Sequence, residues 1–171
     1  MTRDTPSGLS PGFQEIADRA HFLRGKAIGA YAQIEFGLAD ICFQAWEWPA
    51  YHHLKRQLPF KGAARVEEIA RLFMAEGPLA KYWKDLEPLV TQLSSYEKNR
   101  HLFAHGHLML SNSSGAPVVH FRLYVLRNGG VELQAENWTL EYMESIASDI
   151  AAYGHRLGRL LGRIYAEQRL K

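Results

Sequence analysis

Apolar residues recur every three or four positions in three long stretches of this 171-residue chain, at about 12–46, 79–104 and 139–164. That spacing places the apolar side chains on one face of an α-helix. A shorter stretch at about 63–75 has the same rhythm. The pattern therefore predicts a mainly α-helical fold, a bundle of about four principal helices.

Helix-breaking and helix-capping residues mark where these helical stretches begin, end or bend. Gly77-Pro78 separates the second helix from the third, and Pro88 lies inside the third, where it is expected to bend or split the helix. Thr139 is predicted to cap the last helix, with Glu141 in its first turn, where the helix dipole favours negative charge.

Between the third and last helices the period changes to two. Apolar and polar residues alternate over about 118–137, and Asn128-Gly129 interrupts the alternation. This dipeptide is the preferred pair for a tight turn between antiparallel strands. We therefore expect a β-hairpin with one apolar face. Because an isolated hairpin is marginal in water, it must pack on the helices or extend the sheet of a partner.

Glycines recur at four-residue spacing in both terminal helices. Gly25 and Gly29 lie in the first, and Gly154, Gly158 and Gly162 lie in the last. A glycine inside a helix costs about 1 kcal/mol relative to alanine. Small helix faces allow close approach, so we expect these two helices to pack closely, within one chain or across a dimer.

Composition excludes several classes of protein. Lys and Arg total 20 against 18 Asp and Glu, and this near balance argues against a non-specific nucleic-acid coat. The single cysteine, Cys42, excludes an internal disulfide and any multi-cysteine metal site. The most apolar stretch, at 27–48, contains Glu35 and Asp40, which are unfavourable in a membrane span. We expect a flexible tail at 1–10 and a single cytoplasmic domain at 11–171.

The chemistry-bearing residues concentrate at the end of the third helix. Arg100, His101, His105 and His107 lie within eight residues, and Gly106 follows as a helix terminator. Histidine transfers protons near neutral pH and arginine stabilises phosphate charge, a combination typical of phosphoryl transfer. On a straight helix, Arg100 and His105 would point about 140° apart. They converge only if the helix deforms at His105 or if two copies meet.

This stretch resembles the R-x4–6-H signature of the HEPN superfamily (higher eukaryotes and prokaryotes nucleotide-binding domains). It reads Arg100-His101-Leu102-Phe103-Ala104-His105-Gly106, with a histidine in the usual polar slot. The resemblance implies a HEPN-like helical bundle over roughly 12–168. In that superfamily the motif lies near the end of the third main helix, a long final helix follows, and an inserted strand pair is tolerated.

The resemblance also implies a function. Many HEPN proteins are metal-independent endoribonucleases, including toxins and defence components, that act as homodimers with two motifs in one cleft. By position, Arg100 and His105 would be the catalytic pair, with His101 orienting them or the RNA. The RNA 2′-hydroxyl would attack the adjacent phosphate, with no cofactor and no metal. A cognate antitoxin would be a possible partner. The alternative is a non-catalytic HEPN-like module that binds nucleotide, RNA or a protein.

Two further residues are candidates to support Arg100, and the histidines have a second interpretation as metal ligands. Glu35 lies in the apolar stretch of the first helix, next to its apolar face, and is predicted to contact Arg100; the other interpretation is a solvated carboxylate on the edge of the helix. Asn99, beside Arg100, is a second supporting candidate. The spacing of His101, His105 and His107 would also suit zinc, although no cysteine or nearby carboxylate completes the ligand set.

Overall fold

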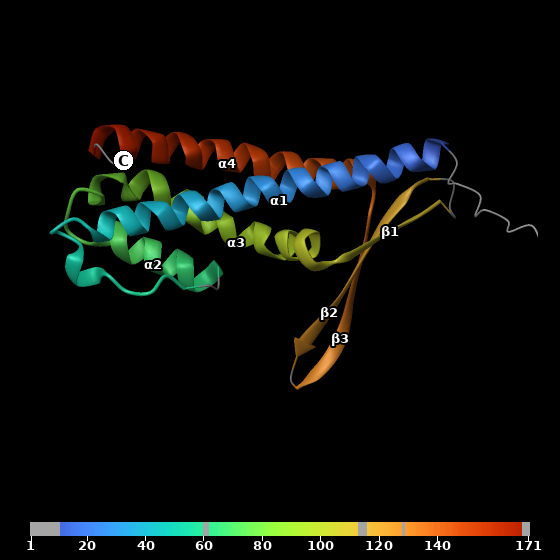
Figure 1. Ribbon diagram of the computed structural model, residues 1–171, viewed down its shortest axis with the longest axis horizontal. Coiled ribbons are helices and arrows are strands. Elements are labelled where there is room, and N and C mark those ends of the chain that lie inside the picture. Colours follow the sequence, from blue (N-terminus) through green and yellow to red (C-terminus); the bar gives the residue numbers. More distant parts are fainter. Residues whose placement is uncertain (1–10, 60–61, 113–115, 128, 169–171) are drawn as a thin grey trace, which may run out of the picture.

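The computed structural model describes residues 11–59, 62–112, 116–127 and 129–168. Within them the principal helices are α1 (Pro11–Trp46), α2 (Gly62–Met74), α3 (Trp83–His105) and α4 (Leu140–Gln168). Two short 3-10 turns, η1 (His52–Leu54) and η2 (Ala80–Tyr82), precede α2 and α3. The predicted mainly helical architecture is confirmed (Figure 1), whereas the tail at 1–10 lies outside the described residues.

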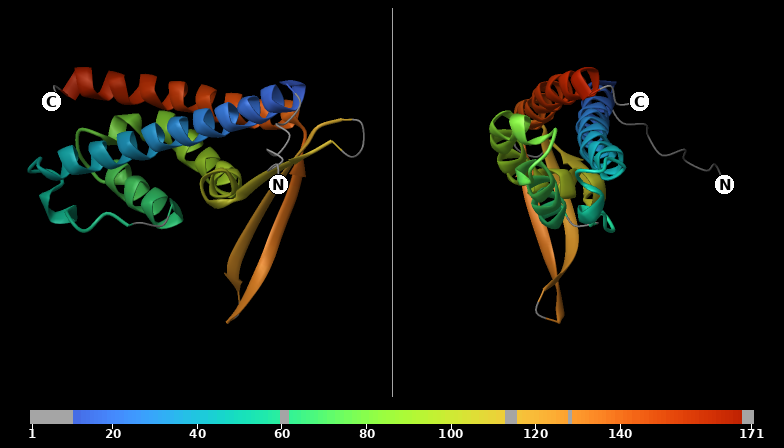
Figure 2. Two further views of the ribbon diagram at one scale, coloured as in Figure 1. Left: turned by 45° about the vertical axis from the view of Figure 1, so that its right-hand side comes forward. Right: turned by 90° about the vertical axis from the view of Figure 1, so that its left-hand side faces the viewer.

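The helices form a bundle in which α1 and α4 run side by side along its length, with α2 and α3 beneath them (Figures 1 and 2). The face of α1 that contains Ala27, Tyr31, Ile34 and Leu38 is buried against the other helices. The predicted stripe of α4 is buried in full: Met143, Ile146, Ile150, Tyr153, Leu157, Leu160 and Ile164. Helical periodicity therefore identified the core-facing sides of both long helices.

The boundaries of the third and fourth helices follow from local chemistry. Pro88 neither ends nor splits α3, because it lies in the second turn and removes only one backbone hydrogen bond there. The residues before Trp83, predicted as α-helix, form η2 instead. Thr139 caps α4 as predicted, since its Oγ1 accepts a hydrogen bond from the Tyr142 amide at 3.1 Å.

A three-stranded antiparallel sheet with strand order β1-β2-β3 lies between α3 and α4. Its strands are β1 (His107–Ser111), β2 (Val118–Arg127) and β3 (Gly130–Trp138). The predicted hairpin corresponds to β2 and β3, and Gly129 has a φ of 78°, the left-handed conformation that its turn requires. Asn128 lies outside the described residues. The sequence pattern did not predict the third strand, β1, because five residues bounded by His107 and Ser111 give little alternation.

Only the base of the sheet packs on the bundle. Phe121 and Trp138 are buried there beside Phe103 of α3, with ring centroids 4.8–5.7 Å apart. The distal half of the hairpin projects away from the helices (Figures 1 and 2). Its large apolar side chains are exposed: Tyr124, Leu126, Val131 and Leu133. The expectation that the hairpin packs on the helices therefore holds for one half of it.

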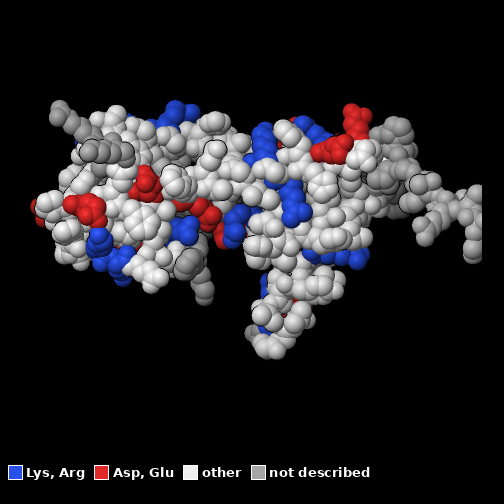
Figure 3. Space-filling view, viewed as in Figure 1, with Lys and Arg blue, Asp and Glu red and all other residues white. Residues whose placement is uncertain are grey.

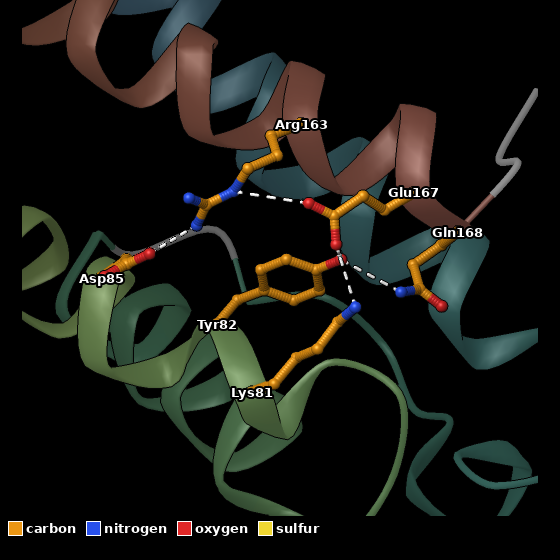
Figure 4. Close-up of polar contacts among 6 residues, drawn as sticks. All are labelled: Lys81, Tyr82, Asp85, Arg163, Glu167 and Gln168. Atoms are coloured by element: carbon orange, nitrogen blue, oxygen red, sulfur yellow. Dashed lines mark hydrogen bonds and ion pairs between the residues drawn. The ribbon is translucent and has the colours of Figure 1, made fainter.

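A polar cluster joins the start of α3 to the end of α4 (Figure 4). The Tyr82 hydroxyl donates to Glu167 at 2.6 Å and accepts from the Gln168 amide at 3.0 Å. Arg163 pairs with Asp85 across the same junction. These contacts fix one end of the bundle, and α3 runs from there to the candidate site at its other end. In the described part of the chain, none of the helices is long and apolar enough to span a membrane.

Candidate site at the end of helix α3

Helix α3 remains regular through His105 and ends at Gly106. The Gly106 amide donates to the Leu102 carbonyl at 2.8 Å, and its backbone then becomes extended. A Cβ atom at this position would lie 2.5 Å from the Leu102 oxygen, so only glycine fits. The helix therefore does not deform at His105. Arg100 and His105 keep the separation of about 140° expected for five helical residues.

The carboxyl end of α3 is capped by an arginine from α1. Arg24 donates from Nε to the Phe103 carbonyl at 2.6 Å and from Nη2 to the Ala104 carbonyl at 3.3 Å. A cation at this end offsets the partial negative charge of the helix dipole. Nothing in the local sequence indicates this role of Arg24, because it depends on how α1 packs against α3.

Arg100 lies in the interface between α3 and α1. Its Nη2 donates to Glu97 Oε1 at 2.7 Å, and its guanidinium lies over the Tyr31 ring at 5.5 Å from the centroid. The other Glu97 oxygen accepts from the Tyr31 hydroxyl at 2.6 Å. The Arg100 side chain is 24% exposed, and its buried Nε has no hydrogen-bond partner among the described residues. The guanidinium therefore keeps an unused donor.

These contacts settle the charge states of the three groups. Burial raises the pKa of the Tyr31 hydroxyl, and the adjacent Glu97 raises it further. Burial would also raise the pKa of Glu97, but the hydrogen bonds from Tyr31 and Arg100 outweigh it and hold that pKa below its usual range. At neutral pH, Tyr31 is thus a protonated donor and Glu97 an ionised acceptor beside the Arg100 cation.

Of the two supporting candidates, Glu35 lies differently from expectation. Glu35 pairs with Arg65 of α2 at 3.3 Å, and it acts on Arg100 only through its charge. The carboxylate that contacts Arg100 is Glu97, three residues earlier in the same helix. A Glu–Arg pair at this spacing is a recognised helical signal that the sequence offered. Asn99 is half-buried beside Arg100.

His101 and His105 lie on one side of α3, one turn apart. Their ring centroids are 4.9 Å apart in an edge-to-face arrangement, with His101 half-buried and His105 exposed. Burial lowers the pKa of His101, and the neighbouring His105 and Arg100 lower it further. The protonated form of His101 is therefore a stronger acid than an ordinary histidine.

Each histidine borders a cleft between α3 and the sheet. The His101 cleft, about 350 Å³, includes Lys98 and Arg127, and the His105 cleft, about 570 Å³, includes His107 and Arg122. Both clefts thus combine imidazole with positive charge. That combination suits a phosphate group and its proton transfers.

The zinc alternative finds no support in the geometry. His107 is the first residue of β1 and does not continue the helical row of His101 and His105. Among the described residues, there is no group of three or more His, Cys, Asp or Glu side chains placed to hold a metal ion.

Comparisons of the chain with models of known protein families, with curated proteins and with solved structures give no match. Any function must therefore be argued from the site itself.

Proposed function

We propose that this protein is a metal-independent endoribonuclease of the HEPN type, whose chemistry is carried by His101, His105 and Arg100. The observation that carries the proposal is the contact between the two imidazoles, one turn apart and next to Arg100. Two adjacent imidazoles can act as base and acid in a single phosphoryl transfer. The clefts beside them contain cations that would contact the RNA backbone: Lys98 and Arg127 together with Glu97 in one, and Arg122 in the other.

In the proposed reaction, neutral His105 takes the proton of an RNA 2′-hydroxyl. The 2′-oxygen then forms a bond to the adjacent phosphorus, and the bond from phosphorus to the 5′-oxygen breaks. Protonated His101 gives its proton to that leaving oxygen. The products are a 2′,3′-cyclic phosphate and a 5′-hydroxyl. The lowered pKa of His101 favours this donation, because a stronger acid protonates a leaving group more readily.

Arg100 lies on a different side of α3 from His105. Its proposed role is therefore inferred from the groups that Arg100 itself contacts. Its guanidinium is held by the Glu97 carboxylate, which has the same charge as a phosphodiester. A backbone phosphate that takes the place of Glu97 would satisfy the same planar donors of the guanidinium. Arg100 would thereby hold the RNA strand while the histidines act on it.

The test is a cleavage assay with several labelled RNAs, with and without EDTA, on the wild type, H101A, H105A and R100A. We expect cleavage that survives EDTA and falls at least about 100-fold in H105A, the typical contribution of a general base. H53A is the matched control, since His53 is exposed on η1. Circular dichroism confirms that each variant folds. Undiminished cleavage by H105A, or cleavage abolished by EDTA, would contradict the proposal.

One observation favours the second candidate, a non-catalytic module that binds nucleotide, RNA or a protein. Helix α3 stays regular, so Arg100 and His105 face different sides, and Glu97 already occupies Arg100. This candidate predicts saturable binding of labelled RNA without any cleavage, and the affinity would fall in R100A and remain unchanged in H105A. Fluorescence anisotropy on the same proteins measures both quantities.

A further inference from the structure

Helix α1 carries a row of apolar residues on its outer face. Three large side chains on this face are exposed, Phe22 by 60%, Phe36 by 72% and Phe43 by 54%. They belong to a row with alternating steps of three and four: Phe22, Gly25, Gly29, Ala32, Phe36, Ala39 and Phe43. We call this row the α1 seam. Its spacing is that of the contact positions of a coiled coil, but here the row faces solvent.

Small residues of the α1 seam border a groove between α1 and α4. The groove has a volume of about 690 Å³, and it is lined by Gly25 and Gly29 on one side and Gly154 and Gly158 on the other. At Gly25, Gly29 and Gly158, no atom lies within 4 Å of where a Cβ would stand. The predicted close approach of the two helices occurs at Gly154, where a Cβ would lie 3.5 Å from Ile34, and is tightest at Gly37, where a Cβ would lie 2.8 Å from Leu161 Cδ1.

We infer that a second copy of this chain docks its α1 antiparallel along the α1 seam. One antiparallel register sets Phe22 against Ala39 of the second copy and Phe36 against its Gly25, with Gly29 and Ala32 at the centre. In this register Phe43 lies opposite Asp18, beyond the end of the α1 seam. A two-fold axis repeats each contact, so the same groove receives a phenylalanine in both copies. Large and small side chains then interdigitate as in a protein core.

Charges beside the α1 seam favour the antiparallel orientation. The flanking row on the side of α4 reads Arg19, Lys26, Gln33 and Asp40. When two copies of α1 pair antiparallel, this row of one copy lies against the same row of the other. Arg19 then faces Asp40 of the second copy. Parallel helices would bring Glu35 next to Asp40, which is repulsive. Arg19 and Asp40 also have contacts within the chain, to Glu144 and Tyr165, and each lies near the molecular surface.

The exposed area is consistent with a dimer of modest affinity. Each phenylalanine buries roughly 200 Å² when fully covered, so the exposed parts of these three amount to about 370 Å². A standard interface buries about 800 Å² on each partner. The walls of the groove supply further area along the roughly 30 Å of helix that the α1 seam spans.

The competing occupant of the groove is RNA. Lys26, His155 and Arg159 line the groove, and Figure 3 shows Lys and Arg side chains gathered over α1 and α4. An RNA backbone would use these cations, but it would leave the three phenylalanines exposed and bare glycine backbone without a counterpart. A second copy covers both features. The α1 seam contains none of the motif residues, so this inference does not rest on the proposed function.

The first experiment is sedimentation velocity on the full chain over a range of micromolar concentrations. We expect a monomer–dimer equilibrium whose dissociation constant rises at least tenfold in F36S and in G29L, which fills the groove. Both positions are exposed, so both variants should fold. L126S, at an exposed residue on the hairpin, is the matched control and should behave as the wild type.

Cross-linking tests the orientation. In a mixture of G29C and A32C chains, the antiparallel register predicts disulfides between the two kinds of chain, whereas a parallel pair predicts disulfides within each kind. A monomer at every concentration would overturn the inference. So would a dimer unaffected by F36S and G29L, or a monomer whose RNA affinity is lost in the K26E/R159E variant. The RNA cleavage assay is separate, so failure of either proposal remains distinguishable from failure of the other.

Discussion

Arg100 is held in place by the same carboxylate that would compete with the proposed RNA phosphate for it. Its guanidinium is positioned by Glu97 and by the Tyr31 ring, and this removes much of the side-chain entropy that binding would otherwise cost. The same carboxylate neutralises the positive charge of the guanidinium, which would otherwise attract a phosphate. Glu97 therefore sets the balance between holding Arg100 in place and releasing it.

Substitution of Glu97 by glutamine tests that balance. In E97Q the side-chain oxygen can still accept a hydrogen bond from Tyr31, but the ionic contact with Arg100 is lost. We expect the affinity for RNA to rise severalfold and the free energy of unfolding to fall by about 1 kcal/mol, since this carboxylate is partly exposed and screened by solvent. Fluorescence anisotropy and urea unfolding measure the two effects.

The matched control for E97Q is E47Q, which removes one exposed carboxylate charge by breaking the contact with Lys55, a residue that lines neither histidine cleft. If E47Q strengthened RNA binding as much as E97Q, general charge would explain the gain and the role given to Glu97 would be wrong.

His101 gives the fold a dependence on pH. Because its pKa is lowered in the folded state, the unfolded chain binds its proton more tightly. The stabilising contribution of neutral His101 is thus complete above about pH 6.5, the ordinary histidine value, and is lost as the pH falls through the folded pKa. Urea unfolding from pH 7.5 to 5 should show a smaller loss of stability in H101Q than in the wild type. Parallel curves for the two proteins would contradict this assignment.

The elements differ in how much of them local sequence could predict. The apolar spacing of three and four was sufficient for α1, α2 and α4, because each buries one continuous face. It gave no information about β1, a five-residue strand that exists through its pairing with β2. In the candidate site, Arg100, His101 and His105 could be found from their types and spacing. Arg24 could not, because only tertiary packing brings it to α3.

Two turns with left-handed glycines should respond differently to alanine. At Gly77, with a φ of 155°, a Cβ would lie 2.6 Å from Tyr51 Oη. Tyr51 is fully buried, and its hydroxyl accepts from the Leu79 amide. At Gly129, with a φ of 78°, the space around a Cβ is open. We expect G77A to cost about 3 kcal/mol through overpacking, and G129A about 1 kcal/mol through backbone strain alone.

Thermal or urea unfolding of both glycine variants measures the two costs. An equal effect at the two positions would mean that Tyr51 moves aside, and the turn before η2 would then be less rigid than its contacts indicate.

At the scale of the whole molecule, the fold combines a well-packed bundle with a projecting hairpin. The helices are tied together at one end by the cluster around Tyr82 and at the other by Arg24 and the aromatic side chains of Phe103, Phe121 and Trp138. Arg122 is the last residue of β2 that pairs with β1. Beyond it, β2 pairs only with β3. The distal hairpin is thus a two-stranded ribbon whose large apolar side chains lie in solvent.

A two-stranded ribbon without a packed face is marginal in water, so its hydrogen bonds should open without unfolding of the bundle. In native-state hydrogen exchange, we expect the amides of 124–127 and 130–134 to exchange well before those at Phe121 and in the middle of α1. The order should be the same in F36S, because the α1 seam lies on another part of the molecule. If the distal amides were instead as protected as the core, something would cover the exposed Tyr124, Leu126 and Leu133 in solution. The hairpin would then be a second surface of assembly, and its protection would fall on dilution.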